Sequence, residues 1–191
     1  IKKYGGPKSI PVEENGRKLW VEFSAPSISP DGRMIAYSAT LFRNSCPEGK
    51  TLWLASSIWT VSARGGEPQR VYSNPEVESA IGRVVWSSDM KHLVFYRYRD
   101  PTGTDGRLDC LDLSTATGKV KTIVPMTKEH NVNLNALALP DNEISFISVP
   151  FGGHSEDARR YIVNIDSGKI RPHKIQVDGK DVVMWNFSNL F

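Results

Sequence analysis

Three short turns of similar sequence constrain the fold of this chain more than any other feature. They lie at residues 29–33, 87–91 and 139–143, and each carries an aspartate at its third position. An alternating apolar strand follows each turn at once, at residues 34–37, 92–96 and 144–147. A repeated strand–turn–strand unit predicts a repeat architecture in which each unit buries its faces against its neighbours.

The remaining pattern indicates an antiparallel all-β domain. Apolar residues rarely recur at helical spacing, whereas period-two alternation is common and the apolar segments are rich in Val, Ile, Tyr, Phe and Trp. Glycine turns such as Asp31-Gly32, Gly65-Gly66 and Ser167-Gly168 separate these segments. A length of 191 residues with 39% hydrophobic and 24% charged residues is typical of one globular domain.

The chain divides into three four-stranded units, which span residues 24–73, 83–125 and 134–176. Their expected strands are residues 25–28, 34–42, 52–61 and 69–72, then 84–86, 92–98, 108–113 and 120–124, then 134–139, 144–149, 161–165 and 170–175. Residues 5–23 and 177–191 are assigned to flanking or shared units, because both segments copy parts of the repeat. The chain therefore begins and ends partway through a unit, which predicts a fragment or a unit completed by joining both ends.

The first unit resembles the TolB-type "PD" β-propeller repeat. Residues 28–37, 58–61 and 65–71 follow that family's pattern closely, whereas the second unit lacks the Pro-Asp-Gly turn and the third matches less well. The resemblance implies an all-β β-propeller of four-stranded antiparallel blades. About three to four blades are present, as a partial propeller or half of a ring. Such repeats occur in TolB-like periplasmic proteins and in propeller domains of prolyl-oligopeptidase-like serine peptidases.

The physics of a blade agrees with this resemblance. Both faces of a blade pack against neighbours, so its inner strands are apolar on both sides, and Trp86 is expected to fill space between blades. Trp53 and Trp59 lie six residues apart, which predicts one shared face and a role in inter-blade packing. The turn aspartates are expected to form turns rather than to bind ligands.

Charge and cysteine usage exclude several classes of function. The net charge of +3 is too weak to predict nucleic-acid or membrane binding, and no apolar run is long enough to span a bilayer. The nearest basic cluster is Arg97, Arg99 and Arg107, which we interpret as a solvated hairpin because aspartates are interleaved with it. Cys46 and Cys110 are interpreted as free thiols, with Cys110 partly buried, although one disulfide between them stays open.

No catalytic, cofactor or metal site is predicted. The chain has no G-x-S-x-G elbow, and its four histidines lie in ordinary strand or loop positions. Residues 100–106 and the group His154, Glu156 and Asp157 offer oxygen and nitrogen ligands, but both are interpreted as hydrophilic loops. The Asn186 sequon falls in an expected strand turn and indicates no compartment.

The candidate partner-binding residues lie in the loops that join one blade to the next. These loops are residues 73–82 and 126–133, and connections on a rigid scaffold often carry function. The candidates are Asn74, Glu76, Glu78, Arg83, Lys128, Glu129, His130 and Asn131.

Two functions are consistent with these observations. The first is a non-catalytic scaffold for protein–protein interaction or ligand sensing, for which the resemblance implies an envelope or periplasmic setting. The alternative is the gating propeller of a prolyl-oligopeptidase-like serine peptidase whose catalytic domain lies outside this chain. Open sheet edges are an aggregation liability, so we expect a homodimer that completes a ring, or the remainder of a longer chain.

Overall fold

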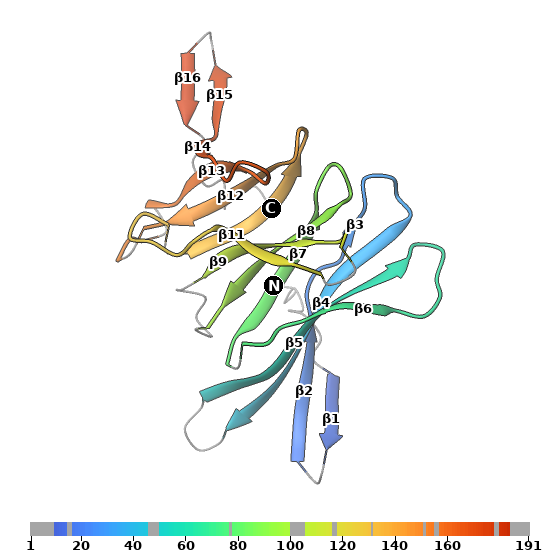
Figure 1. Ribbon diagram of the computed structural model, residues 1–191. Helices are drawn as coiled ribbons and strands as arrows, with labels where there is room; N and C mark the ends of the chain where they lie inside the picture. The colour runs from blue at the N-terminus through green and yellow to red at the C-terminus, as the bar shows by residue number, and fades with distance from the viewer. Residues whose placement is uncertain are drawn as a thin grey trace, which may run out of the picture.

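The structure is a computed structural model. It describes residues 10–14, 17–45, 50–76, 78–99, 106–115, 118–130, 132–150, 152–154, 157–177 and 180–183. Over these ranges the regular structure is β-strand and no α-helix is present (Figure 1). Accordingly, no helix in the described part is long and apolar enough to cross a membrane.

The first sheet is larger than a four-stranded blade. Its strands are β1 (Ile10–Glu14), β2 (Arg17–Phe23), β3 (Ser27–Ile28), β4 (Met34–Ser45), β5 (Lys50–Ser62) and β6 (Gln69–Ser73). They lie in the order β1-β2-β4-β5-β6, and β3 pairs with the part of β4 nearest its start. The assignment of residues 5–23 to a flanking or shared unit stays a prediction, and the β2 part of that segment pairs here with β4 of the first sheet. The length of β4 lets it pair with both β2 and β3.

The second and third sheets each have four antiparallel strands that follow one another in sequence. The second contains β7 (Ala80–Trp86), β8 (His92–Tyr98), β9 (Arg107–Asp112) and β10 (Val120–Val124). The third contains β11 (Val132–Leu139), β12 (Glu143–Val149), β13 (Arg159–Asn164) and β14 (Ile170–Pro172). The all-β class and the four-stranded antiparallel blades are confirmed, and the sheets do not close into a ring (Figure 1).

The last predicted strand, residues 170–175, is divided in the structure. β14 ends at Pro172, and β15 (Lys174–Val177) pairs instead with β16 (Lys180–Val183) in a separate hairpin. His173 lies at the break, where its backbone N–H donates to the carbonyl of Arg160 at 2.9 Å. Residues 177–191, which the repeat pattern assigns to a flanking or shared unit, lie mainly outside the described residues.

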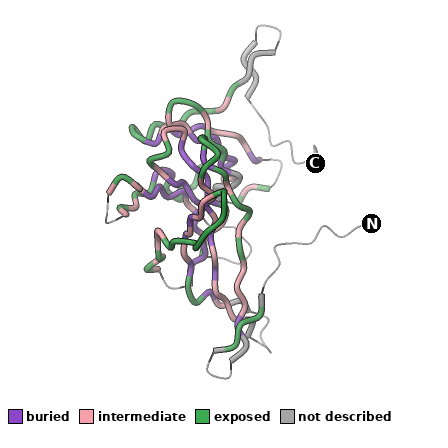
Figure 2. Tube along the Cα trace, turned by 90° about the vertical axis from the view of Figure 1, so that its right-hand side faces the viewer, coloured by how far each residue is buried: buried purple, intermediate pink, exposed green. Residues whose placement is uncertain are grey.

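Two apolar cores hold the three sheets together, and β8 contributes to both. Leu93 and Phe95 belong to the core shared with the first sheet, whereas Val94 and Tyr96 belong to the core shared with the third. Adjacent residues of a strand point to opposite faces, so an apolar run supplies both cores. The buried residues accordingly follow the middle of the stack of sheets (Figure 2).

The tryptophans follow the expected packing only in part. Trp86 is buried between the first two sheets, and its indole N–H donates to the carbonyl of Ser27 at 3.2 Å. The expected shared face of Trp53 and Trp59 is wrong, because a bulge at Leu54 shifts the pairing register of β4 and β5. Trp53 therefore packs edge-on against Tyr98 of the second sheet at 5.0 Å, while Trp59 lies on the outer face of the first.

The first two of the three repeated turns are closed by the same set of hydrogen bonds. In the first turn Ser29 Oγ donates to Asp31 Oδ1 at 2.6 Å, and the Arg33 N–H donates to the same oxygen at 3.1 Å. Ser87 Oγ and the Lys91 N–H bind Asp89 Oδ1 in the same way, at 2.5 and 3.0 Å. The prediction that these aspartates form turns is confirmed for both.

Candidate functional site

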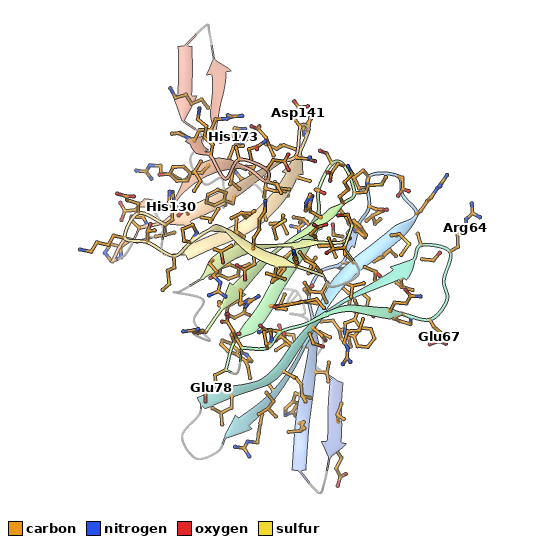
Figure 3. The ribbon with its side chains drawn as sticks, viewed as in Figure 1. Arg64, Glu67, Glu78, His130, Asp141 and His173 are labelled. Atoms are coloured by element: carbon orange, nitrogen blue, oxygen red, sulfur yellow. The ribbon has the colours of Figure 1, made fainter. Side chains whose placement is uncertain are left out.

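The connections between blades gather at one end of the sheets. In Figure 3, Glu78 and His130 lie on the left, whereas the residues of the tight turns lie farther right, with Asp141 at the upper middle and Arg64 at the right. The blade connections therefore share an end with the last residues of β8 and the first of β9, where Arg97 and Arg107 contact Glu76, opposite the tight turns. We call this end the loop end. Asn131, the last predicted site residue, lies outside the described residues.

Within the connection from β6 to β7, Asn74 has a structural role, whereas Glu78 is exposed. The Asn74 side-chain amide donates to Ser79 Oγ at 2.6 Å, and its oxygen accepts the Glu76 N–H at 3.2 Å. Glu78 is exposed at the tip of the loop, with a positive φ of 57°. Asn74 thus fixes the loop, which positions Glu76 toward the second sheet.

Glu76 binds three arginines of the second sheet. Its Oε1 accepts a hydrogen bond from Arg97 Nη1 at 2.7 Å and another from Arg107 Nη2, and its Oε2 accepts one from Arg99 Nη2 at 3.3 Å. Burial alone raises the pKa of Glu76, but the hydrogen bond from Arg107 and the charges of Arg97 and Arg107 outweigh burial and lower it. Glu76 therefore ties the connection between blades to the strands of the second blade.

Asp109 lies beneath this cluster and is almost fully buried, at 1% exposure of its side chain. Its Oδ2 lies 2.9 Å from Nε of Arg97, which is itself 5% exposed, and Arg107 Nε donates to both of its oxygens at 3.1 and 3.2 Å. Thr122 Oγ1 adds a hydrogen bond at 2.8 Å, and Arg97 Nη2 donates to the Tyr72 hydroxyl at 2.8 Å.

The interpretation of Arg97, Arg99 and Arg107 as a solvated hairpin is therefore wrong. Only Arg99 is largely exposed, at 65%, whereas Arg97 is buried in a network that joins both blades. We call Glu76, Arg97, Arg99, Arg107 and Asp109 the arginine network. Its guanidinium and carboxylate groups are fixed before any partner arrives, and Met126 closes a small hollow of about 80 Å³ beside it.

The predicted residues after β10 divide between the surface and the third sheet. Lys128 and Glu129 are exposed. His130 packs edge-on against Tyr161 with ring centroids 4.7 Å apart, and its Nδ1 lies 3.0 Å from Ser148 Oγ. Burial lowers the pKa of His130, which favours the neutral ring at pH 7.

Arg83 lies in a strand rather than in a loop, because β7 begins at Ala80. It lines a cleft of about 460 Å³ between the first and second sheets, together with Glu22 and Tyr98. Neither Glu22 nor Tyr98 was predicted, since each lies in an ordinary strand and no local pattern distinguishes it. The pairing of β2 with β4, which the sequence did not reveal, brings Glu22 to this cleft.

Two serine–histidine pairs occur in the described part of the chain, but their geometry does not form a nucleophilic site. Ser145 Oγ lies 3.1 Å from His173 Nδ1, and Ser148 Oγ lies near His130. The two serines are 0% and 1% exposed, so a substrate cannot reach them. They satisfy buried polar groups instead.

Metal and thiol chemistry find no support among the described residues. No group of three His, Cys, Asp or Glu side chains there is placed to hold a metal ion. Residues 100–105, Glu156 and Cys46 lie outside those residues. Cys110 is free and fully buried, and burial raises the pKa of its thiol to about 12, so it is unreactive at neutral pH.

Comparison with known proteins supports the fold. No family model and no curated protein sequence matches the chain. Dipeptidyl peptidase 4 from Porphyromonas gingivalis matches with a TM-score of 0.51 and 11% identity, over 79% of this chain and 26% of that one.

Two further solved structures match less closely. TolB from Acinetobacter baumannii has a TM-score of 0.44 and 15% identity, over 78% of this chain and 42% of that one. Prolyl oligopeptidase B from Galerina marginata has a TM-score of 0.43 and 15% identity, over 79% of this chain and 28% of that one. The chain spans less than half of each of these three proteins. Its own four-stranded sheets and the match to the dipeptidyl peptidase support the fold of a partial β-propeller.

Proposed function

We propose that this chain is a non-catalytic, TolB-like β-propeller scaffold that binds a protein partner at its loop end. The observation that carries the proposal is the arginine network. Arginine and tyrosine are enriched at energetically dominant interface positions, and the cluster places Arg99 at the surface beside buried Arg97 and half-buried Tyr72. Because Glu76 and Asp109 already fix these side chains, a partner would lose little conformational entropy in ordering them.

The experiment compares two charge reversals at opposite ends of the blades. The variant Arg99→Glu with Lys128→Glu alters the loop end, whereas Arg33→Glu with Arg64→Glu alters exposed turns and changes the net charge equally. Proteins retained by the immobilised chain are identified, and the affinity of each purified protein is then measured. We expect the loop-end variant to weaken binding at least tenfold and the turn variant to leave it unchanged. Equal loss in both variants contradicts the proposal.

A peptidase propeller is the second candidate, because the fold matches part of a dipeptidyl peptidase. The scaffold proposal expects that a fluorophosphonate probe does not label the purified chain and that fluorogenic dipeptide substrates are not cleaved. Labelling at a serine would overturn it. A G-x-S-x-G elbow followed by Asp and His in the parent gene would instead favour the peptidase alternative.

Assembly completes the proposal. Residues 24–73, 83–125 and 134–176 act as blades, and the open faces of the first and third sheets are covered by a second copy or by the remainder of a longer chain. Light scattering measures the molar mass in solution. A dimer supports ring completion, and a stable monomer of this chain alone excludes it.

A further inference from the structure

The cleft between the first and second sheets contains charged groups that the fold leaves without partners. Its walls come from β2, β4, β7 and the end of β8, and its volume is about 460 Å³. The groups that carry the argument are Glu22, Ile81, Arg83 and Tyr98.

Glu22 is a half-buried carboxylate with no hydrogen bond or ion pair to any described residue. It pairs across the strands with Thr40, whose buried side chain faces the second sheet, so the Glu22 side chain faces the same way. Burial raises the pKa of Glu22. A desolvated carboxylate without a partner is unfavourable, in contrast to Glu76, which binds three arginines.

The opposite wall supplies a fixed phenol. The Tyr98 ring is held by Trp53 at 5.0 Å and by Tyr96 at 5.1 Å. Burial, and next the negative charge of Glu22, raise the pKa of Tyr98, so its hydroxyl stays protonated and can donate. An aromatic ring near a carboxylate is an environment that favours an organic cation.

Arg83 adds the opposite charge. Its side chain is exposed, and its guanidinium forms no ion pair with the described residues. The nearby hydroxyls are already used, since Ser38 Oγ donates toward the carbonyls of Ile81 and Gly82 at 2.9 Å each. Among the described residues, the free polar groups of the cleft are therefore one carboxylate, one phenol and one guanidinium, and Ile81 supplies apolar wall beside them.

We propose that this cleft binds a small organic zwitterion, with its ammonium group on Glu22 and its carboxylate toward Arg83. The methylene chain between the two charges contacts Ile81, and the Tyr98 ring covers the ammonium end. Amino acids and short peptides belong to this chemical class. The inference does not depend on a protein partner at the loop end, so either proposal can fail without the other.

Calorimetric titration of the purified chain tests the proposal with zwitterions of graded length. The probes are glycine, 4-aminobutanoate, 6-aminohexanoate and 8-aminooctanoate, and the matched single-charge controls are hexylamine and hexanoate. We expect one zwitterion to bind at least tenfold more tightly than both controls. The series also identifies the spacing between the two charges that the cleft accepts.

Three variants assign the contacts. Glu22→Gln removes a charge that burial disfavours, so the variant is expected to fold, and it should weaken the preferred zwitterion at least tenfold. Arg83→Gln should reduce that zwitterion to the affinity of hexylamine and leave hexylamine unchanged. Glu78→Gln, outside the cleft, should change neither. The proposal is overturned if no zwitterion exceeds its controls, or if Glu22→Gln binds as the wild type does.

Discussion

Replacing Asp109 with Asn should destabilise the fold by about 3 kcal/mol. The substitution keeps the volume of the side chain but removes a buried charge 2.9 Å from Arg97 Nε. Removing one partner of a buried ion pair typically costs roughly 3–5 kcal/mol, because the remaining charge stays desolvated. Glu76, which binds Arg97 at 2.7 Å, remains in the variant, so the guanidinium keeps one carboxylate partner. The expected cost is therefore at the lower end of that range.

Urea unfolding at pH 7, followed by tryptophan fluorescence, measures this cost. The slope of unfolding free energy against urea should stay constant while the midpoint falls. Asp166→Asn is the matched control, because Asp166 is exposed and accepts only a long hydrogen bond from Asn142 at 3.4 Å, so it should cost less than about 0.5 kcal/mol.

A double-mutant cycle measures the interaction energy between Arg97 and Asp109. Arg97→Met replaces the buried guanidinium with an apolar side chain. In that variant, Asp109→Asn should lower the free energy of unfolding by less than it does in the wild type. We expect a coupling of at least about 1.5 kcal/mol, within the range for contacting residues. A loss below about 1 kcal/mol for Asp109→Asn, or strictly additive losses, would refute the assignment of this network as a buried charge pair.

Three further changes test separate parts of the structure. Met90 has a φ of 61° where the first turn has Gly32, so Met90→Gly should stabilise by about 0.5 kcal/mol and Met90→Val should destabilise, both by urea unfolding. A methyl group at Gly106 would overlap the Tyr96 ring, so Gly106→Ala should lower stability by about 3 kcal/mol, and an unchanged melting temperature would contradict this packing. Burial, and then the charges of neighbouring arginines, lower the pKa of His173 below its ordinary value of 6.5. The folded state therefore favours the neutral ring. The stability that this preference contributes above pH 6.5 is lost as the pH falls through the folded pKa. Melting temperatures at pH 7.5 and 5.5 should differ less in His173→Gln than in the wild type.

The strands could be predicted from sequence because each blade is built from local signals. Alternation and the Asp-containing turns predict both ends of β8 correctly. They predict the ends of β4 and β12 to within three residues. The bulge at Leu54 could not be predicted, because it depends on how β5 meets its neighbour rather than on its own residues. One inserted residue there reverses the face of Trp53.

The arginine network was missed for a related reason. Arg97 and Arg107 are direct cross-strand partners in β8 and β9. Like charges at such positions repel, so the pairing requires carboxylates from elsewhere. Asp109 comes from the same strand as Arg107, but Glu76 comes from a connection whose path only the folded structure defines. The sequence therefore shows the residues of the network without showing that they meet.

The contact between the first and second sheets changes character along its length. Near the tight turns it is apolar, with Ala36, Ile58 and Leu93 in one buried cluster. Toward the loop end, the contact is polar instead, with hydroxyls such as that of Ser38 and the buried charge of Arg97. Apolar contacts are non-directional, whereas buried polar groups require particular partners and so fix geometry more strictly. At the loop end of this interface, the buried polar groups therefore hold the side chains in fixed positions. Both proposed binding sites lie beside these fixed groups.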